Sequence, residues 1–288
     1  MKKTFKDRQD GWYLKPPTPL HALMPHLMRN RTDAEVSTRE VFDVTEIMKY
    51  IEKKNKNSYY KYTFFHAFLT AMAKTIYNRP YLNRFISGRR MYERKFISFG
   101  FVAKQKFEDH SEENLMIMKL DNKMNIDDIS KKVSGDVKKV RSNKGNSMAD
   151  DMAFFGKMPR WMLRIVFFVL RFLDFHGWVP KSIWQSDSNY VTILFSNLGS
   201  IKCPSCYHHL NNYGTNSIMI TIGEIRKEKR LNDKGVLEDR DMVDITFTLD
   251  ERIADGFYFA KSVRILEKIL KEPKLFDDNI DKELHYEK

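Results

Sequence analysis

The sequence has few cysteines, no long apolar run and no internal repeat. Only two cysteines occur among 288 residues, which is too few for a disulfide framework and is typical of a reducing compartment. The basic start of the chain is followed by neither an apolar run nor a small-residue cleavage site, so it does not read as a secretory signal. We therefore expect a cytoplasmic protein.

One segment, Met158 to Pro180, is apolar enough to raise the question of a membrane. Its longest uncharged apolar run is Ile165 to Leu170, whereas a helix needs about 20 residues to span a bilayer. Four charged residues interrupt the rest: Arg160, Arg164, Arg171 and Asp174. We expect no membrane span. The segment is read as a buried or interface helix, with a membrane-surface helix or a groove for an acyl chain as alternatives.

The composition is that of a globular, basic protein. Apolar residues make up 42% of the chain and aromatic residues 13%, enough to form a core. The net charge of +12 favours an anionic partner such as nucleic acid, a membrane or a phosphorylated cofactor. The lysines between residues 125 and 143 lack interleaved aromatic residues. They therefore read as a solvated helix face, and we expect no nucleic-acid partner.

The spacing of apolar residues predicts a mixture of helices and strands after a meandering N-terminal arm. Strands are expected near residues 39–44, 95–105, 189–196, 216–228 and 242–250, and helices near 45–55, 64–79, 125–143 and 257–270. The polar run NKGNSMADD (143–151) reads as a linker.

Six pieces of this pattern occur in a specific order: FDVTEIMKYIEKK, TFFHAFLTAMAKTIYNRPYLN, ISFGFVAK, NIDDISKKV with KVRSNKG, LFSNLGS, and DERIADGFYFAKSVRILEKIL. Together they resemble the catalytic domain of the 2-oxoacid dehydrogenase acyltransferases and their relative chloramphenicol acetyltransferase. The resemblance spans residues 39–273 with an insertion at about 149–187. It leaves an N-terminal arm at 1–38 and a charged C-terminal tail at 274–288.

The resemblance implies a fold, an activity and an assembly. The expected fold is an α/β (α+β) two-layer sandwich in which a mixed sheet is flanked by helices. The implied activity is transfer of an acyl group from a coenzyme A thioester to a hydroxyl or thiol of a small-molecule acceptor, with coenzyme A as co-substrate and no metal. In the family, homotrimers form active-site channels between subunits.

The resemblance also assigns roles to one turn. In the family, a serine or threonine near the SNLG turn donates a hydrogen bond to the oxyanion, which indicates Ser196, while Asn197 and Gly199 shape the turn. The alternative for Ser196 is a residue that simply suits the start of a glycine turn.

The acidic turn before the last helix departs from the family at one position. The family's general base is a histidine on an HxxxDG turn, and Glu251 stands there instead. A glutamate has an ordinary pKa of about 4.3, so Glu251 could serve only if burial raised its pKa by about two units. Arg252, Asp255 and Gly256 match the motif. The family's aspartate is structural and pairs with an arginine, so Asp255 is expected to shape the turn and to cap the last helix.

A second candidate base lies in the YHHL stretch. His208 and His209 are adjacent, so in an extended chain only one could point into a channel. They read either as a packed loop pair or as a relocated general base. Together with Cys203 and Cys206 they could supply zinc ligands, but a single C-x-x-C is a weak signal, and plain cysteines are the simpler interpretation.

Three functional hypotheses remain open at this point. The first is an acyltransferase with a replacement base. Because no lipoyl-bearing module or swinging linker precedes the domain, we expect it to act outside a normal dehydrogenase complex. The second is a catalytically inactive homologue that serves as a trimeric scaffold or ligand-binding protein. The third is a basic protein that meets nucleic acid or membrane through its lysines or the 158–180 segment.

Overall fold

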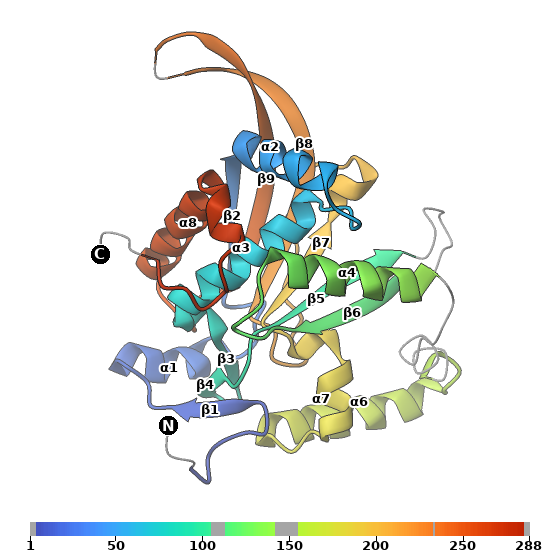
Figure 1. Ribbon diagram of the computed structural model, residues 1–288. Helices are drawn as coiled ribbons and strands as arrows, with labels where there is room; N and C mark the ends of the chain where they lie inside the picture. The colour runs from blue at the N-terminus through green and yellow to red at the C-terminus, as the bar shows by residue number, and fades with distance from the viewer. Residues whose placement is uncertain (1–3, 105–112, 142–154, 233, 285–288) are drawn as a thin grey trace.

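A six-stranded mixed sheet with helices on one face forms the body of the molecule (Figure 1). This computed structural model describes residues 4–104, 113–141, 155–232 and 234–284. The strands are β1 (Gly11–Leu14), β2 (Glu35–Asp43), β3 (Arg84–Ser87), β4 (Arg90–Arg94), β5 (Ser98–Lys104), β6 (Glu113–Lys119), β7 (Ile193–Asn197), β8 (Ile218–Leu231) and β9 (Leu237–Asp250). The helices are α1 (Pro19–Leu27), α2 (Thr45–Lys56), α3 (Phe64–Asn78), α4 (Ile126–Arg141), α6 (Arg160–His176), α7 (Lys181–Ser186) and α8 (Gly256–Lys271).

The large sheet has the strand order β2-β9-β8-β7-β5-β6. Strand β7 runs parallel to both of its neighbours, β5 and β8, and the other pairs are antiparallel. The expected two-layer sandwich with a mixed sheet is therefore confirmed. A second sheet of three short strands, β1-β4-β3, lies beside it, and β8 and β9 continue past the main sheet as a projecting hairpin (Figure 1).

The core lies between the large sheet and helices α2, α3, α4 and α8 (Figure 1). Along β9, Ile245 and Phe247 point into this core, whereas Thr246 and Thr248 point to the opposite face, as the period of a strand requires. Helix α3 is buried along almost its whole length and ends ahead of Pro80, as the sequence predicts.

The two ends of the chain are more ordered than the sequence suggests. The expected arm at 1–38 contains β1, α1 and the start of β2, so its boundary falls inside a strand. The buried Arg8 forms an ion pair with Asp10 and donates hydrogen bonds to Ser87 in β3 and to the Asp174 carbonyl oxygen in α6. In the expected tail, Phe276 and Ile280 are buried against the core. Residues 4–38 and 274–284 therefore form part of the folded unit.

The segment expected to be an insertion, about 149–187, contains α6 and α7, which lie beside the small sheet. Of the two readings of the apolar 158–180 segment, a buried helix does not hold, because no residue of α6 is buried; an interface helix stays a prediction. No helix in the described part of the chain is long and apolar enough to cross a membrane. The expected linker at 143–151 lies outside the described residues.

Candidate functional site

The end of β7 presents Ser196 at a tight turn. Alternation along the strand puts Phe195 in the core and Ser196 on the other face, where it is half-buried. The chain then turns through a short 3₁₀ helix, Leu198–Ile201. A Cβ at Gly199 would lie 2.5 Å from the carbonyl oxygen of Gly223, so this turn requires glycine. The Ser196 hydroxyl makes no hydrogen bond with any described residue.

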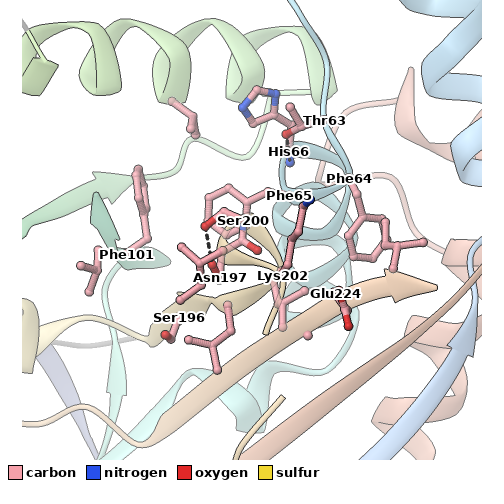
Figure 2. Close-up of a pocket in the computed structure, with 18 of the residues that line it drawn as sticks. Thr63, Phe64, Phe65, His66, Phe101, Ser196, Asn197, Ser200, Lys202 and Glu224 are labelled. Atoms are coloured by element: carbon pink, nitrogen blue, oxygen red, sulfur yellow. Dashed lines mark hydrogen bonds between the residues drawn. The ribbon is translucent and has the colours of Figure 1, made fainter. Parts of the chain in front are cut away.

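A pocket of about 740 Å³ opens beside this turn. Its walls come from the first turn of α3, from β5, from α4 and from the turn regions of β7 and β8 (Figure 2). Apolar side chains such as Phe101, Val133 and Val137 form much of the lining, which also carries two charged residues, the exposed Lys202 and the half-buried Glu224. The pocket can therefore take a ligand with an extended, largely apolar arm.

Sequence reasoning missed one polar residue of this pocket, His66. It is 6% exposed, its Nδ1 has no hydrogen-bond partner among the described residues, and burial lowers its pKa to about 4. Figure 2 shows it beside Thr63, on the opposite wall from Ser196. The sequence feature that could have indicated the position of His66 is Thr63. Thr63 caps α3 by accepting a hydrogen bond from the His66 backbone N–H and thereby fixes His66 in the first turn of the helix.

The loop that follows the turn crosses the outer face of the sheet. The Cys206 carbonyl oxygen accepts hydrogen bonds from Thr221 at 2.5 Å and from Thr246 at 2.6 Å, and Thr221 is the register partner of Ser196. Four residues further on, the Leu210 N–H donates to Glu35 at 2.8 Å. The loop thus runs from beside Ser196 toward the end of β9.

Both candidate loop histidines lie on this crossing segment and are exposed. Their rings stack at 4.9 Å, and the His208 Nδ1 lies 2.9 Å from the His209 carbonyl oxygen. Neither lines the pocket beside Ser196. Cys203 and Cys206 are unpaired, and the described residues contain no group of three or more histidine, cysteine or acidic side chains placed to hold a metal ion.

The acidic turn is built on a buried ion pair. Arg252 contacts Asp250 at 2.7 Å, with both side chains at most 3% exposed. Arg252 therefore pairs with Asp250 and not with Asp255, for which the family's aspartate–arginine pair was expected. The expected cap is confirmed, because Asp255 accepts a hydrogen bond of 2.8 Å from the Tyr258 backbone N–H at the start of α8. Gly256 is the exposed first residue of that helix.

Glu251 lies on this turn, half-buried, with its backbone N–H donating to the Ala34 carbonyl oxygen at 2.9 Å. Its carboxylate makes no hydrogen bond or ion pair with the described residues. Ser196 is in register with Thr221, which is paired with Thr246. Glu251 lies five positions past Thr246, about 17 Å along the strand at 3.4 Å per residue. Ser196 and Glu251 therefore do not meet within one chain.

The family model of the 2-oxoacid dehydrogenases acyltransferase (catalytic domain) matches residues 181–276, which include both turns. A comparison with curated protein sequences gives no significant match.

Solved structures with the same fold include dihydrolipoamide acetyltransferases and a chloramphenicol acetyltransferase. A probable dihydrolipoamide acetyltransferase from Listeria monocytogenes 4b F2365 has a TM-score of 0.59 at 16% identity, covering 90% of this chain and 94% of that chain. The Azotobacter vinelandii dihydrolipoamide acetyltransferase gives 0.61 at 15% identity, with 91% and 94% covered. A chloramphenicol acetyltransferase gives 0.53 at 12% identity, with 90% and 99% covered. The predicted resemblance and fold are thus confirmed.

Proposed function

We propose that this protein is an acyltransferase that binds an acyl-coenzyme A in the pocket beside Ser196 and passes the acyl group to a hydroxyl or thiol of a small acceptor. The observation that carries the proposal is Ser196, which lines a pocket of about 740 Å³ and whose hydroxyl makes no hydrogen bond with any described residue. A hydroxyl held on a rigid glycine turn is suited to stabilise a developing oxyanion.

The pocket suits coenzyme A as the donor. The apolar surfaces of Phe101, Val133 and Val137 match the largely apolar parts of a pantetheine arm and an acyl group. Lys202 and the N-terminal turn of α3 favour the negative charge of its phosphates. The net charge of +12 also favours an anionic co-substrate.

The general base comes from a neighbouring subunit in a homotrimer. Glu251 and Ser196 are too far apart within one chain, and His208 and His209 are exposed on the loop that crosses the sheet between them. In the Azotobacter vinelandii enzyme a serine, a histidine and an asparagine were studied for their role in the catalytic mechanism. In this chain Ser196 and Glu251 stand at the motif positions of the family's serine and histidine.

The reaction then proceeds in two steps, attack on the thioester and release of coenzyme A. The base, a loop imidazole or the Glu251 carboxylate, takes the proton of the acceptor O–H or S–H as that atom attacks the thioester carbonyl carbon. Ser196 donates a hydrogen bond to the oxyanion that forms. The C–S bond breaks as the carbonyl is restored, and the base returns the proton to the departing thiolate, which gives free coenzyme A and the acylated acceptor.

The test is an acceptor screen with acetyl-coenzyme A and longer acyl-coenzyme A donors. Free coenzyme A is quantified by chromatography, because the exposed Cys206 would react with a thiol reagent. Ser196→Ala is expected to lower kcat by about 100-fold. Ser200→Ala is the matched control, since that exposed hydroxyl lies on the same turn and lines the same pocket but donates to the Asn197 carbonyl oxygen.

Two variants separate the candidate bases: the double substitution of His208 and His209 by glutamine, and Glu251→Gln. The variant that removes the true base should lose most of its kcat and retain donor binding. Donor binding without turnover of any acceptor would favour an inactive homologue. A folded trimer that shows no donor binding and no turnover would refute the proposal.

We also propose a cytoplasmic location, which the unpaired Cys203 and Cys206 favour.

A further inference from the structure

Helix α6 exposes a continuous apolar face. Its 17 residues contain no buried side chain, although the helix is strongly amphipathic in sequence. The exposed face consists of Trp161, Ile165, Phe168, Val169, Phe172 and Phe175, which are between 45% and 72% exposed. These positions follow helical spacing and lie along one side of a helix about 25 Å long. Scattered exposed apolar residues are ordinary, but a contiguous face of this kind marks an interaction surface.

The opposite side of α6 is fixed to the protein. Asp174 accepts hydrogen bonds from Arg8 and from the Tyr190 hydroxyl, and its carbonyl oxygen accepts from Ser87 at 3.0 Å. Leu173 packs against the small cluster that contains Trp184. The helix is therefore held in one orientation, and the apolar face points away from the rest of the chain.

Three arginines border the apolar face. Arg160, Arg164 and Arg171 are exposed and lie within about 40° of one another around the helix axis. They form no ion pair with any described residue. The only acidic residue of α6 is Asp174, which faces inward. The exposed surface of the helix therefore carries positive charge without a compensating carboxylate of its own.

We infer that α6 docks this protein onto the surface of an anionic lipid bilayer, lying parallel to the membrane plane. An interfacial helix combines a face of tryptophan, phenylalanine and aliphatic residues with an arginine or lysine border, and α6 has both. Exposed tryptophans stand at its first turn and just past its end, Trp161 at 63% and Trp178 at 60%, where the amphipathic indole ring favours the headgroup region.

A second copy of the chain related by a twofold axis fits this face less well. A contact across a twofold axis would bring each arginine row close to its copy, and like charges at an interface are costly. The position of the helix also suits a flat surface. Helix α6 lies along one margin of the molecule, at the end opposite the β8–β9 hairpin (Figure 1).

The test is flotation of the full chain with vesicles of phosphatidylcholine alone and of phosphatidylcholine with phosphatidylglycerol. Binding is expected on the anionic vesicles, weakening as salt rises. Tryptophan emission should shift to the blue on binding. Replacing Arg160, Arg164 and Arg171 by glutamine should weaken binding by about 100-fold, at about fivefold for each arginine.

Two further variants test the apolar face. Ile165→Glu with Phe168→Glu should abolish binding, whereas Leu231→Glu with Leu237→Glu, equally exposed apolar residues at the hairpin tip, should leave it unchanged. Circular dichroism and light scattering confirm the fold and the oligomeric state. Three results would overturn the inference: no binding above the neutral-vesicle level at low salt, an equal loss in the hairpin variant, or a change of oligomeric state on α6 substitution without any vesicle binding.

Discussion

The buried His66 predicts a specific loss of stability in acid. Its side chain is 6% exposed, its Nδ1 has no hydrogen-bond partner in the described part of the chain, and burial lowers its pKa from 6.5 to about 4. Between pH 6.5 and 4 the unfolded chain binds a proton at this position that the folded chain does not. The free energy of unfolding therefore falls as pH falls through this window, and the loss is complete below the folded pKa.

The magnitude follows from the two pKa values. A shift of one unit corresponds to about 1.4 kcal/mol, so the full effect is about 3 kcal/mol. At pH 5 the unfolded residue is almost fully protonated and the folded one is almost neutral, which leaves a penalty of about 2 kcal/mol. Near pH 7 the same expression gives only about 0.2 kcal/mol. The acid sensitivity should therefore appear between these two pH values.

Urea unfolding of the wild-type chain and of His66→Leu at pH 7 and pH 5 measures this effect, at one fixed protein concentration because the chain is expected to form a trimer. The stability of the variant relative to wild type should rise by about 2 kcal/mol between pH 7 and pH 5. His208→Gln, at an exposed position, is the matched control and should show no such rise. A difference between wild type and His66→Leu that stays constant with pH would refute the reasoning.

Two further substitutions test the turns of the site. Gly199→Ala should cost donor binding and stability, because the new Cβ would lie 2.5 Å from the Gly223 carbonyl oxygen; calorimetric titration with coenzyme A and thermal melting measure both, and a variant that binds like wild type would contradict the prediction. Asp255→Ala should cost about 1 kcal/mol of stability through loss of the α8 cap while Asp255→Asn, a good capping residue, retains it. Urea unfolding distinguishes the two, and equal losses would show that the cap is not the cause.

The main sheet and the core helices could be predicted because each has a strong period. Strand β9 alternates cleanly and α3 carries apolar residues along its length, so the sequence alone indicates their type. Strands β3 and β4 were missed because they are only four and five residues long and no alternating pattern can develop over that length. The edge strand β6 is not among the strands that the sequence predicts.

The N-terminal region escaped prediction for a different reason. Arg8 joins Ser87 and the Asp174 carbonyl oxygen through hydrogen bonds of 2.7 Å each, across 79 and 166 positions of sequence. Such long-range contacts leave no periodic trace. The same limit applies to α6, because its amphipathic pattern indicates an apolar face but does not say whether the protein itself covers that face.

For the site, sequence motifs located the two turns but not the neighbours of Ser196. The SNLG turn places Ser196, Asn197 and Gly199 together, since adjacent residues need no tertiary structure to meet. His66 reaches the same pocket from another element, the first turn of α3. Only the three-dimensional packing of α3 against β7 brings that imidazole to the pocket.

The acidic turn can accept a histidine without losing its shape. The buried Arg252–Asp250 pair holds the turn, and residue 251 contributes only its backbone N–H, bonded to Ala34. Glu251→His should therefore leave stability within about 0.5 kcal/mol of wild type. Because an imidazole is a far better base at neutral pH than a glutamate, kcat at pH 7 should rise at least about tenfold if this turn faces the acceptor. Acyl transfer is measured across pH, with Glu251→Gln as the control that keeps the volume and removes the base. A folded Glu251→His variant with unchanged kcat would assign the proton transfer to the loop that carries His208 and His209.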